Sequence, residues 1–549
     1  MKSIVSIFLL AGFLANAQIL NHKKDFTRQD SLRGSNNEFR DWWEVYRYNI
    51  EIEPDFDRKF IKGINRIQFV VTNTYNNSIL QIDLQQPMKI DSIRVNGRDF
   101  SDYIRDGNVY FLNLEAQLKN KELDHLLEIH FSGNPRVAVN PPWDGGWIFT
   151  QDQQGRPWMS VACQGLGASV WYPNKDYLGD EPDQGASLSI IVPENLIGIA
   201  NGRLTDMKEV GNHKIKFTWE VKNPINNYNI IPYIGHYSVI KDSYTGEKGK
   251  LDLEYWVLDY NREKAENQFK QTHEMLTSVE HWFGPYPFYE DGFKLVESPH
   301  LGMEHQSAIA YGNEFRDGYL GRDISGSGWG LKWDFILIHE AGHEWFGNSI
   351  TNKDVADMWI HEGFTSYSET LHTQRLFGIE AGDDYVIGTR EKILNDVPMI
   401  GIYGVNQEGS TDIYYKGANM IHTFRQLLED DELFREILRG LNFNYSHQTV
   451  TTRQVESYIS LKSRIDLTEF FNQYLRTTQI PVFEYKIQGN QITYRWTNIV
   501  EKFDMPVKIA RSNEWLFPTA EWKTETLKPG LEKDFGIDRN FYIYTKPLP

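Results

Sequence analysis

The chain has 549 residues, 40% of them hydrophobic and 14% aromatic, so it is long enough to form several packed domains. Its formal net charge of −18 argues against nucleic acid or an anionic membrane surface as a partner. Cys163 is the single cysteine, which excludes an intrachain disulfide and a cysteine-rich zinc site.

The first 17 residues have the features of a secretory signal peptide. Lys2 precedes an apolar run from Ile4 to Leu14, and Ala15-Asn16-Ala17 forms an A-x-A cleavage site. The run is too short to span a bilayer, and no cysteine follows it to carry a lipid anchor. We expect cleavage after Ala17, export to the periplasm or the medium, and no membrane anchor; a buried N-terminal helix is the alternative.

Residues 18–40 are polar and are expected to form a loosely ordered leader. From residue 41 to 248, short alternating runs broken by Asn-Gly and Asp-Gly predict an N-terminal antiparallel β domain. Two stretches rich in Gly and Pro, residues 140–147 and 163–183, are expected to be loops within it. Cys163 begins the second stretch, and we expect it to be buried because no paired base is evident nearby.

Residues 249–478 show helical periodicity and are expected to form a mixed α+β domain. Helices are predicted at 265–283, at about 333–348 and at 359–377, with a strand at 293–297 and an adjoining edge strand at 307–311. Residues 479–549 alternate again and predict a small C-terminal β-sandwich. The predicted fold class is therefore multidomain α+β.

A candidate metal site lies within the second and third of these helices. His339, Glu340 and His343 form an H-E-x-x-H motif, and residues four apart share one face of a helix. Glu362 follows His343 after an eighteen-residue gap. Two histidines and one carboxylate form a catalytic zinc set whose fourth position is open for water. The alternative is a helix with two surface or core histidines. The presence of Glu362 at the expected spacing makes this alternative less favoured.

Together with three further segments, this motif resembles the M1 family of zinc aminopeptidases, gluzincins with a thermolysin-like catalytic domain. Leu301 to His305 stand where that family has its G-x-M-E-N motif, and Tyr414 to Gly417 stand where it has Y-E-K-G. Gln164 lies nine residues before Pro173, where the family places a polar residue near the substrate amine. The resemblance covers roughly residues 40 to 545, and the loop at 141–146 is similar to the Bacteroidetes-type branch.

The resemblance implies a role for each matched residue. His339, His343 and Glu362 would hold one Zn²⁺ per chain, which activates water, and Glu340 would be the general base. Tyr414 would stabilise the oxyanion, and Glu304, assisted by Gln164, would bind the α-amine of a peptide with a free N-terminus. Further expected site residues are Gly302 and Met303, which would bind substrate, and Glu369, which is either an acceptor for a ligand histidine or a solvated helix carboxylate.

Three departures from the family pattern keep alternatives open. His305 replaces the Asn of G-x-M-E-N and Tyr415 replaces the Glu of Y-E-K-G, so Tyr415 is a second candidate for the oxyanion donor. The sequence ends at Pro549, where larger members continue into a helical domain, so a more open site is expected. A secreted aminopeptidase is the favoured function; a zinc endopeptidase or other zinc hydrolase with relaxed N-terminal specificity, and a non-catalytic binding protein, are the alternatives. A monomer is favoured.

Overall fold

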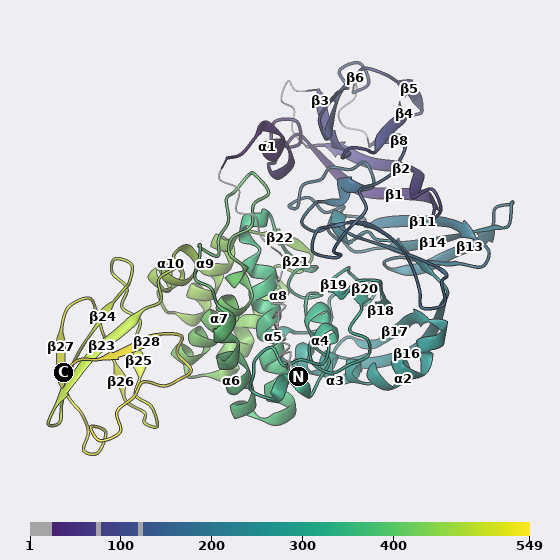
Figure 1. Ribbon diagram of the computed structural model, residues 1–549. Helices are drawn as coiled ribbons and strands as arrows, with labels where there is room; N and C mark the ends of the chain where they lie inside the picture. Colours follow the sequence, from purple (N-terminus) through teal and green to yellow (C-terminus); the bar gives the residue numbers. More distant parts are fainter. Residues whose placement is uncertain (1–24, 73–77, 119–123) are drawn as a thin grey trace, which may run out of the picture.

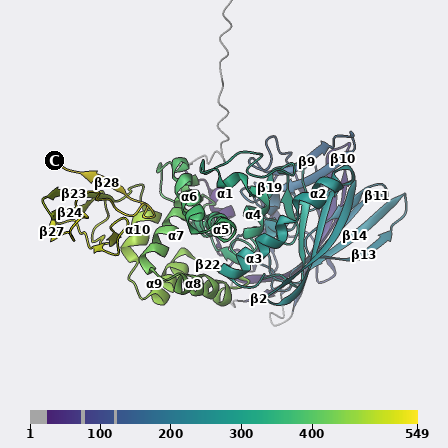
Figure 2. The same cartoon turned by 90° about the horizontal axis from the view of Figure 1, so that it is seen from below.

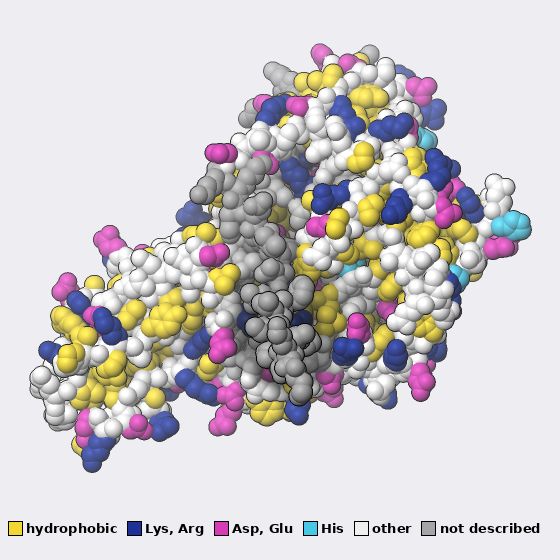
Figure 3. All heavy atoms as spheres, in the orientation of Figure 1, with side chains coloured by type: hydrophobic (Ala, Val, Ile, Leu, Met, Phe, Trp, Pro, Cys, Tyr) yellow, Lys and Arg dark blue, Asp and Glu magenta, His cyan; other side chains and the backbone are white. Residues whose placement is uncertain are grey.

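The computed structural model describes residues 25–549 except 73–77 and 119–123 (Figure 1). The predicted signal peptide and the beginning of the predicted leader lie outside the described residues. Within the described ranges, no helix is long and apolar enough to cross a membrane. On the face shown in Figure 3, acidic and basic side chains are interspersed.

An eight-stranded sheet forms the main layer of the N-terminal domain. The alternation of Tyr48, Ile50 and Ile52 places these side chains in the core, as expected for a strand with one buried face. Neighbouring described strands of this sheet pair antiparallel, except for β1 (Trp43–Asp55) and β11 (Ala186–Pro193), which pair in parallel. In spatial order the strands are β13 (Arg203–Glu209), β14 (Lys214–Val221), β11 (Ala186–Pro193), β1 (Trp43–Asp55), β2 (Phe60–Val71), β8 (His125–Gly133), β4 (Lys89–Val95) and β5 (Arg98–Phe100).

Two smaller sheets complete this domain. One has three strands, β3 (Ile79–Asp83), β7 (Val109–Asn113) and β6 (Tyr103–Asp106). The other has four, β12 (Ile197–Ile199), β15 (Tyr233–Gly235), β10 (Pro157–Ala162) and β9 (Gly146–Gln151). Gln164 follows the end of β10, and the short 3₁₀-helix η2 (Asn227–Asn229) precedes β15, so this second sheet carries the two segments that reach the site described below.

The second domain includes residues on both sides of the boundary predicted at residue 248. Its five-stranded sheet has the order β16 (Tyr237–Gly246), β17 (Gly249–Leu258), β18 (Phe293–Glu297), β20 (Ile309–Tyr311) and β19 (Gly302–Met303). Because β16 and β17 form one hairpin, the boundary expected at residue 248 falls in its turn, and a division before Tyr237 agrees better with the pairing. The strand expected at the edge, residues 307–311, corresponds to β20 and is not an edge strand, because β19 pairs beyond it.

Helices cover this sheet and continue away from it (Figures 1 and 2). They are α2 (Arg262–Gln268), α3 (Gln271–Phe283), α4 (Phe335–Gly342), α5 (Trp359–Phe377), α6 (Ile379–Gly388), α7 (Tyr415–Leu428), α8 (Asp431–Asn444), α9 (Thr452–Ser463) and α10 (Thr468–Arg476). A short parallel pair, β21 (Ile350–Asn352) with β22 (Gln448–Val450), lies among them.

Two helix predictions differ from the structure in detail. The helix expected at 265–283 is divided between α2 and α3 by a turn at Phe269, whose buried ring packs edge-on against Tyr311 with the ring centroids 4.8 Å apart. The helix expected to reach Asn348 ends at Gly342, because the chain turns there and Gly347 adopts a φ of +133°. The third helix, α5, has the predicted bounds, and all its residues from Trp359 to Thr373 are buried.

The C-terminal part is a β domain at one end of the molecule, next to α10 (Figures 1 and 2). It contains a four-stranded sheet and a two-stranded ribbon. The sheet has the order β27 (Lys523–Thr526), β24 (Gln491–Thr497), β23 (Val482–Gln488) and β28 (Tyr544–Pro547), and the ribbon pairs β25 (Val507–Lys508) with β26 (Trp515–Leu516). The predicted multidomain α+β class is confirmed.

The prediction of a loosely ordered leader is wrong for its described part. Helix α1 (Arg28–Gly34) begins with a capping box between Thr27 and Asp30. Leu32 is buried in a small cluster with Val109 and Phe111. The polar composition concealed this order because the stabilising contacts come from strands β3 and β7, which lie more than forty residues away.

Candidate active site

Helices α4 and α5 bring the three predicted metal ligands together. The Nε2 atoms of His339 and His343 lie 3.3 Å apart, and Oε2 of Glu362 lies 3.5 Å and 3.4 Å from them. A tetrahedral zinc site with bonds of about 2.0–2.1 Å has ligand–ligand edges of about 3.3–3.4 Å. Glu362 Oε2 is buried and lacks a hydrogen-bond partner among the described residues. Donor types, spacing and this unpaired oxygen all fit one zinc ion.

Buried hydrogen bonds orient both imidazoles. Nδ1 of His339 donates to Glu369 Oε1 at 2.7 Å, and Nδ1 of His343 donates to the carbonyl of Phe346 at 3.0 Å. Glu369 is 0% exposed and also accepts a 2.6 Å bond from the hydroxyl of Tyr385. The solvated alternative for Glu369 is therefore wrong. Because each Nδ1 carries the proton, each Nε2 presents a lone pair toward the metal position.

Glu340 lies beside the ligands in a buried position. Burial raises the pKa of its carboxyl to about 7, with the charge of Glu304 adding to the rise and the two histidines opposing it. A pKa near neutrality suits a group that accepts and returns a proton. A Cβ at Gly302 would lie 2.5 Å from Glu340 Oε1, so the glycine of β19 leaves the room that this carboxylate occupies. The neighbouring Met303 is 6% exposed.

Glu304 is held in one orientation by residues from the N-terminal domain. Its Oε1 accepts from Gln164 Nε2 at 2.5 Å and from the hydroxyl of Tyr228 at 2.8 Å. Its backbone carbonyl accepts from Asn348 Nδ2 at 2.7 Å. No hydrogen bond to Oε2 is formed by the described residues, so this oxygen is available to a ligand.

The carboxylates of Glu304 and Glu340 form one cluster with a predicted metal ligand. Glu304, Glu340 and His343 each offer an atom within 4.8 Å of the others. Tyr228 was not anticipated: it lies 76 residues before Glu304 in an otherwise unremarkable strand-rich stretch. No sequence pattern marked it, and only the packing of η2 against the catalytic domain brings it to the site.

Tyr414 rather than Tyr415 faces the ligands. The ring of Tyr414 stacks near His339 with centroids 6.0 Å apart. Burial raises the pKa of Tyr414 well above its ordinary value, and the charges of Glu362 and Glu408 add to the rise. For Tyr415, burial is again the largest cause of a raised pKa, but the charge of Glu369 contributes more to the rise than that of Glu362. Both phenols therefore keep their protons at neutral pH, and Tyr414 can donate near the metal position.

Two other predicted features have structural roles. Cys163 is buried, as expected, and burial raises the pKa of its thiol, which makes it a poor nucleophile. His305, which replaces the family asparagine, is buried, and its Nδ1 lies 2.6 Å from the hydroxyl of Tyr233. That hydroxyl donates to the carbonyl of Ala308 at 2.8 Å. His305 thus ties the segment that carries Glu304 to β15.

Residues 268–474 match the sequence profile described as the Peptidase family M1 domain. Leukotriene A-4 hydrolase of Xenopus laevis is 22% identical over 458 residues, covering 78% of this chain and 70% of that protein. Probable aminopeptidase 2 of Sulfurisphaera tokodaii is 21% identical over 467 residues, covering 82% of this chain and 55% of that protein. Aminopeptidase N of Lactococcus lactis is 25% identical over 247 residues, which is 28% of its own length.

Solved structures share the fold. An M1 zinc metallopeptidase of Deinococcus radiodurans bound to a Tyr-Ser-Ala substrate aligns with a TM-score of 0.67 at 18% identity, covering 80% of this chain and 95% of that chain. Aminopeptidase A of Legionella pneumophila in complex with aspartic acid aligns with a TM-score of 0.74 at 15% identity, covering 92% of this chain and 60% of that chain.

Proposed function

We propose that this chain, which carries a peptidase family M1 domain over residues 268–474, is an exported zinc aminopeptidase that removes residues from the free N-terminus of peptides. One observation carries the proposal. A carboxylate, Glu304, lies beside Glu340 and the ligand His343 and is held by two donors on one oxygen only. That arrangement suits a site that binds an ammonium group next to the bond to be cleaved.

The chemistry is divided between the metal and the side chains around it. Zinc held by His339, His343 and Glu362 would lower the pKa of water and polarise the scissile carbonyl. Glu340 takes the proton of the attacking water and later passes it to the leaving amine. Tyr414 donates a hydrogen bond from its hydroxyl to the carbonyl oxygen as negative charge develops there.

Selection for a free N-terminus follows from the charge of Glu304. A substrate ammonium pairs with Oε2, while Gln164 and Tyr228 hold Oε1. An acetylated terminus or an internal peptide bond brings no positive charge, so it would leave a buried carboxylate unpaired. The distance between the amine site and Glu340 would then limit cleavage to the first peptide bond.

Digestion of an unblocked decapeptide by the zinc-loaded protein from Gln18 onward, followed by mass spectrometry, tests this proposal. We expect a ladder of products, each shortened by one residue from the N-terminus. Glu340→Gln should retain zinc and yield no products, which separates loss of the base from loss of the metal. Internal fragments appearing before the ladder would favour the endopeptidase alternative.

Export is supported by the signal-type sequence at residues 1–17. Sequencing the N-terminus of protein recovered outside the cytoplasm should give Gln18 as the first residue. Recovery of the full-length chain from the cytoplasm alone would contradict this part of the proposal.

A further inference from the structure

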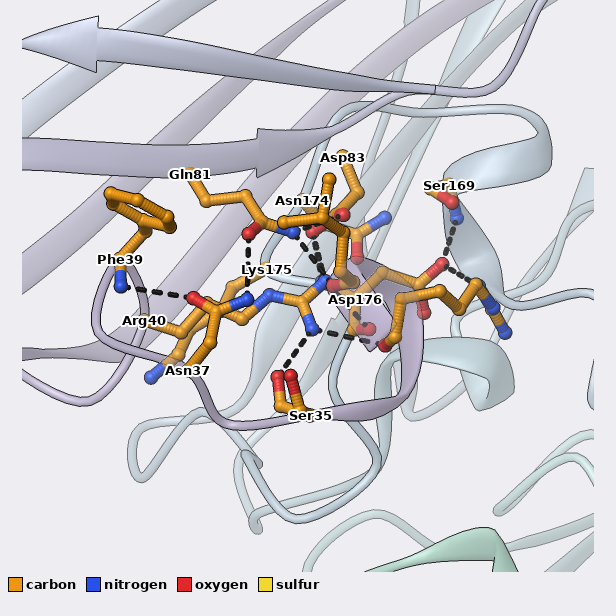
Figure 4. A network of polar contacts seen from close by, with 12 residues as sticks. Ser35, Asn37, Phe39, Arg40, Gln81, Asp83, Ser169, Asn174, Lys175 and Asp176 are labelled. Carbon is orange, nitrogen blue, oxygen red and sulfur yellow. Dashed lines mark hydrogen bonds and ion pairs between the residues drawn. The ribbon is translucent and has the colours of Figure 1, made fainter. Parts of the chain in front are cut away.

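Residues 27–41, here called the brace, pack against the loop that carries Gln164. That loop, residues 163–170, is here called the amine loop. Arg33 of α1 donates from Nη1 to Asp176 Oδ2 at 2.5 Å, and the same oxygen accepts from the backbone N–H of Ser169 at 3.1 Å. One carboxylate oxygen therefore joins the brace to the end of the amine loop; its bond to Ser169 is drawn in Figure 4.

The amine loop is also contacted in its middle. The guanidinium of Arg33 lies directly against Gly167, where a Cβ would be 1.9 Å from Nη1. On another side, Asn406 Nδ2 donates to the carbonyl of Gly165 at 3.2 Å. A Cβ at Gly34 would lie 2.1 Å from the backbone nitrogen of Asn406, so the brace and the loop of Asn406 touch each other as well. The amine loop, which carries Gln164, is therefore held between the brace and the loop that contains Asn406.

Buried charges fix the brace itself. Arg40 is 0% exposed and donates from Nη2 to Asp83 Oδ2 at 2.5 Å. Its Nη1 donates to the carbonyls of Arg33 and Ser35, each at 3.0 Å, which anchors the end of α1. Arg40 and Ser35 are labelled in Figure 4. A buried ion pair adds little net stability compared with apolar packing, but it specifies one arrangement closely. Such specificity is useful where a loop must be placed accurately.

Arg33 is also close to the amine site. A cavity of about 20 Å³ is lined by Arg33, Gln164, Tyr228 and Asn406, among others. Gln164 and Tyr228 are the two donors to Glu304 Oε1. A shift of the arginine would open space next to both donors.

We propose that Arg33 is a positioning residue for amine recognition, which holds the amine loop so that Gln164 reaches Glu304. This inference rests on the proposed aminopeptidase function. It assigns to the segment before the first domain a part in substrate selection, through the contacts from Arg33 to Asp176 and Gly167.

The test compares Arg33→Met with Arg28→Met in the full mature chain. Arg28 lies on the same helix, but its side chain is 60% exposed and pairs with Asp106 at the surface. Both variants are assayed for kcat and KM on an unblocked aminoacyl substrate and for the ratio of unblocked to N-acetylated cleavage, with thermal unfolding as a check on folding. Since an angstrom of misplacement can cost up to about 10²-fold, we expect Arg33→Met to raise KM roughly tenfold and change kcat less. Arg28→Met should match the wild type.

A folded Arg33→Met protein with wild-type KM and wild-type selectivity would overturn the inference. If Arg33→Met does not fold, Asn406→Ala provides the test, because it removes the hydrogen bond to Gly165 on the other side of the amine loop. A raised KM for Asn406→Ala supports the inference, and an unchanged KM overturns it. Failure of the proposed function is a distinct outcome, because then the wild type itself would cleave both substrates equally well.

Discussion

Replacing Glu369 by Gln tests how the buried acceptor of His339 supports metal binding. The 2.7 Å bond from His339 Nδ1 to a fully buried carboxylate fixes the ring and makes its Nε2 more basic. Gln keeps the size and one acceptor oxygen but removes the charge, and its NH₂ cannot accept from the hydroxyl of Tyr385. Loss of such a partner weakens metal affinity about 10–100-fold, or about 1.4–2.8 kcal/mol.

Competition with a chromophoric zinc chelator measures this change directly. The matched control is Glu344→Gln. Glu344 is also buried and lies next to His343, but its carboxylate accepts from the backbone of Ser307 at 2.8 Å and the hydroxyl of Tyr286 at 3.1 Å and contacts no ligand. We expect a weaker zinc affinity for Glu369→Gln but not for the control Glu344→Gln, and added zinc should restore the activity of Glu369→Gln. A zinc Kd within twofold of the wild type for Glu369→Gln would refute the reasoning.

Two further predictions follow from the site and its surroundings. Tyr414→Phe should lower kcat about 10²–10³-fold with little change in KM, as for loss of an oxyanion donor, while Tyr415→Phe should have a much smaller effect; equal losses in steady-state assays would contradict the assignment. Burial raises the pKa of Glu344 to about 8, so its contribution to stability is full below about pH 4.5 and is lost as the pH rises through 8, by at most about 1.4 kcal/mol per pH unit. Denaturation at pH 5 and pH 8 should show that Glu344→Gln loses less stability over this interval than the wild type; identical losses would contradict the raised pKa.

The sequence predicted the parts of the site that depend on local spacing. His339 and His343 share a face because they are four residues apart, and that holds although α4 ends at Gly342. Glu362 was placed correctly on a helix whose bounds were also predicted. These features are encoded within short stretches, so periodicity and motif spacing are sufficient to find them.

Other features depend on contacts between distant segments. Tyr228 and Gln164 bind Glu304 although they lie 76 and 140 residues before it in the chain, and no local sequence pattern predicts these contacts. Residues 18–40 were predicted to be a loosely ordered leader because the order of their described part comes from contacts with Asp83 and Asp176, far along the chain. The domain boundary predicted at residue 248 depends on the same kind of information, because alternation indicates that β16 is a strand but not which sheet it joins.

The most direct test of the central claim is the ratio of kcat/KM for an unblocked aminoacyl substrate to that for its N-acetylated form. The measurement compares the zinc-loaded wild type with Glu304→Ala. If Glu304 binds the α-amine, the wild type should favour the unblocked substrate by about 10²-fold or more, the scale expected for leaving a buried charge unpaired. Glu304→Ala should lose most of that preference. Equal cleavage of both substrates by the wild type, or an undiminished preference in Glu304→Ala, would contradict the account.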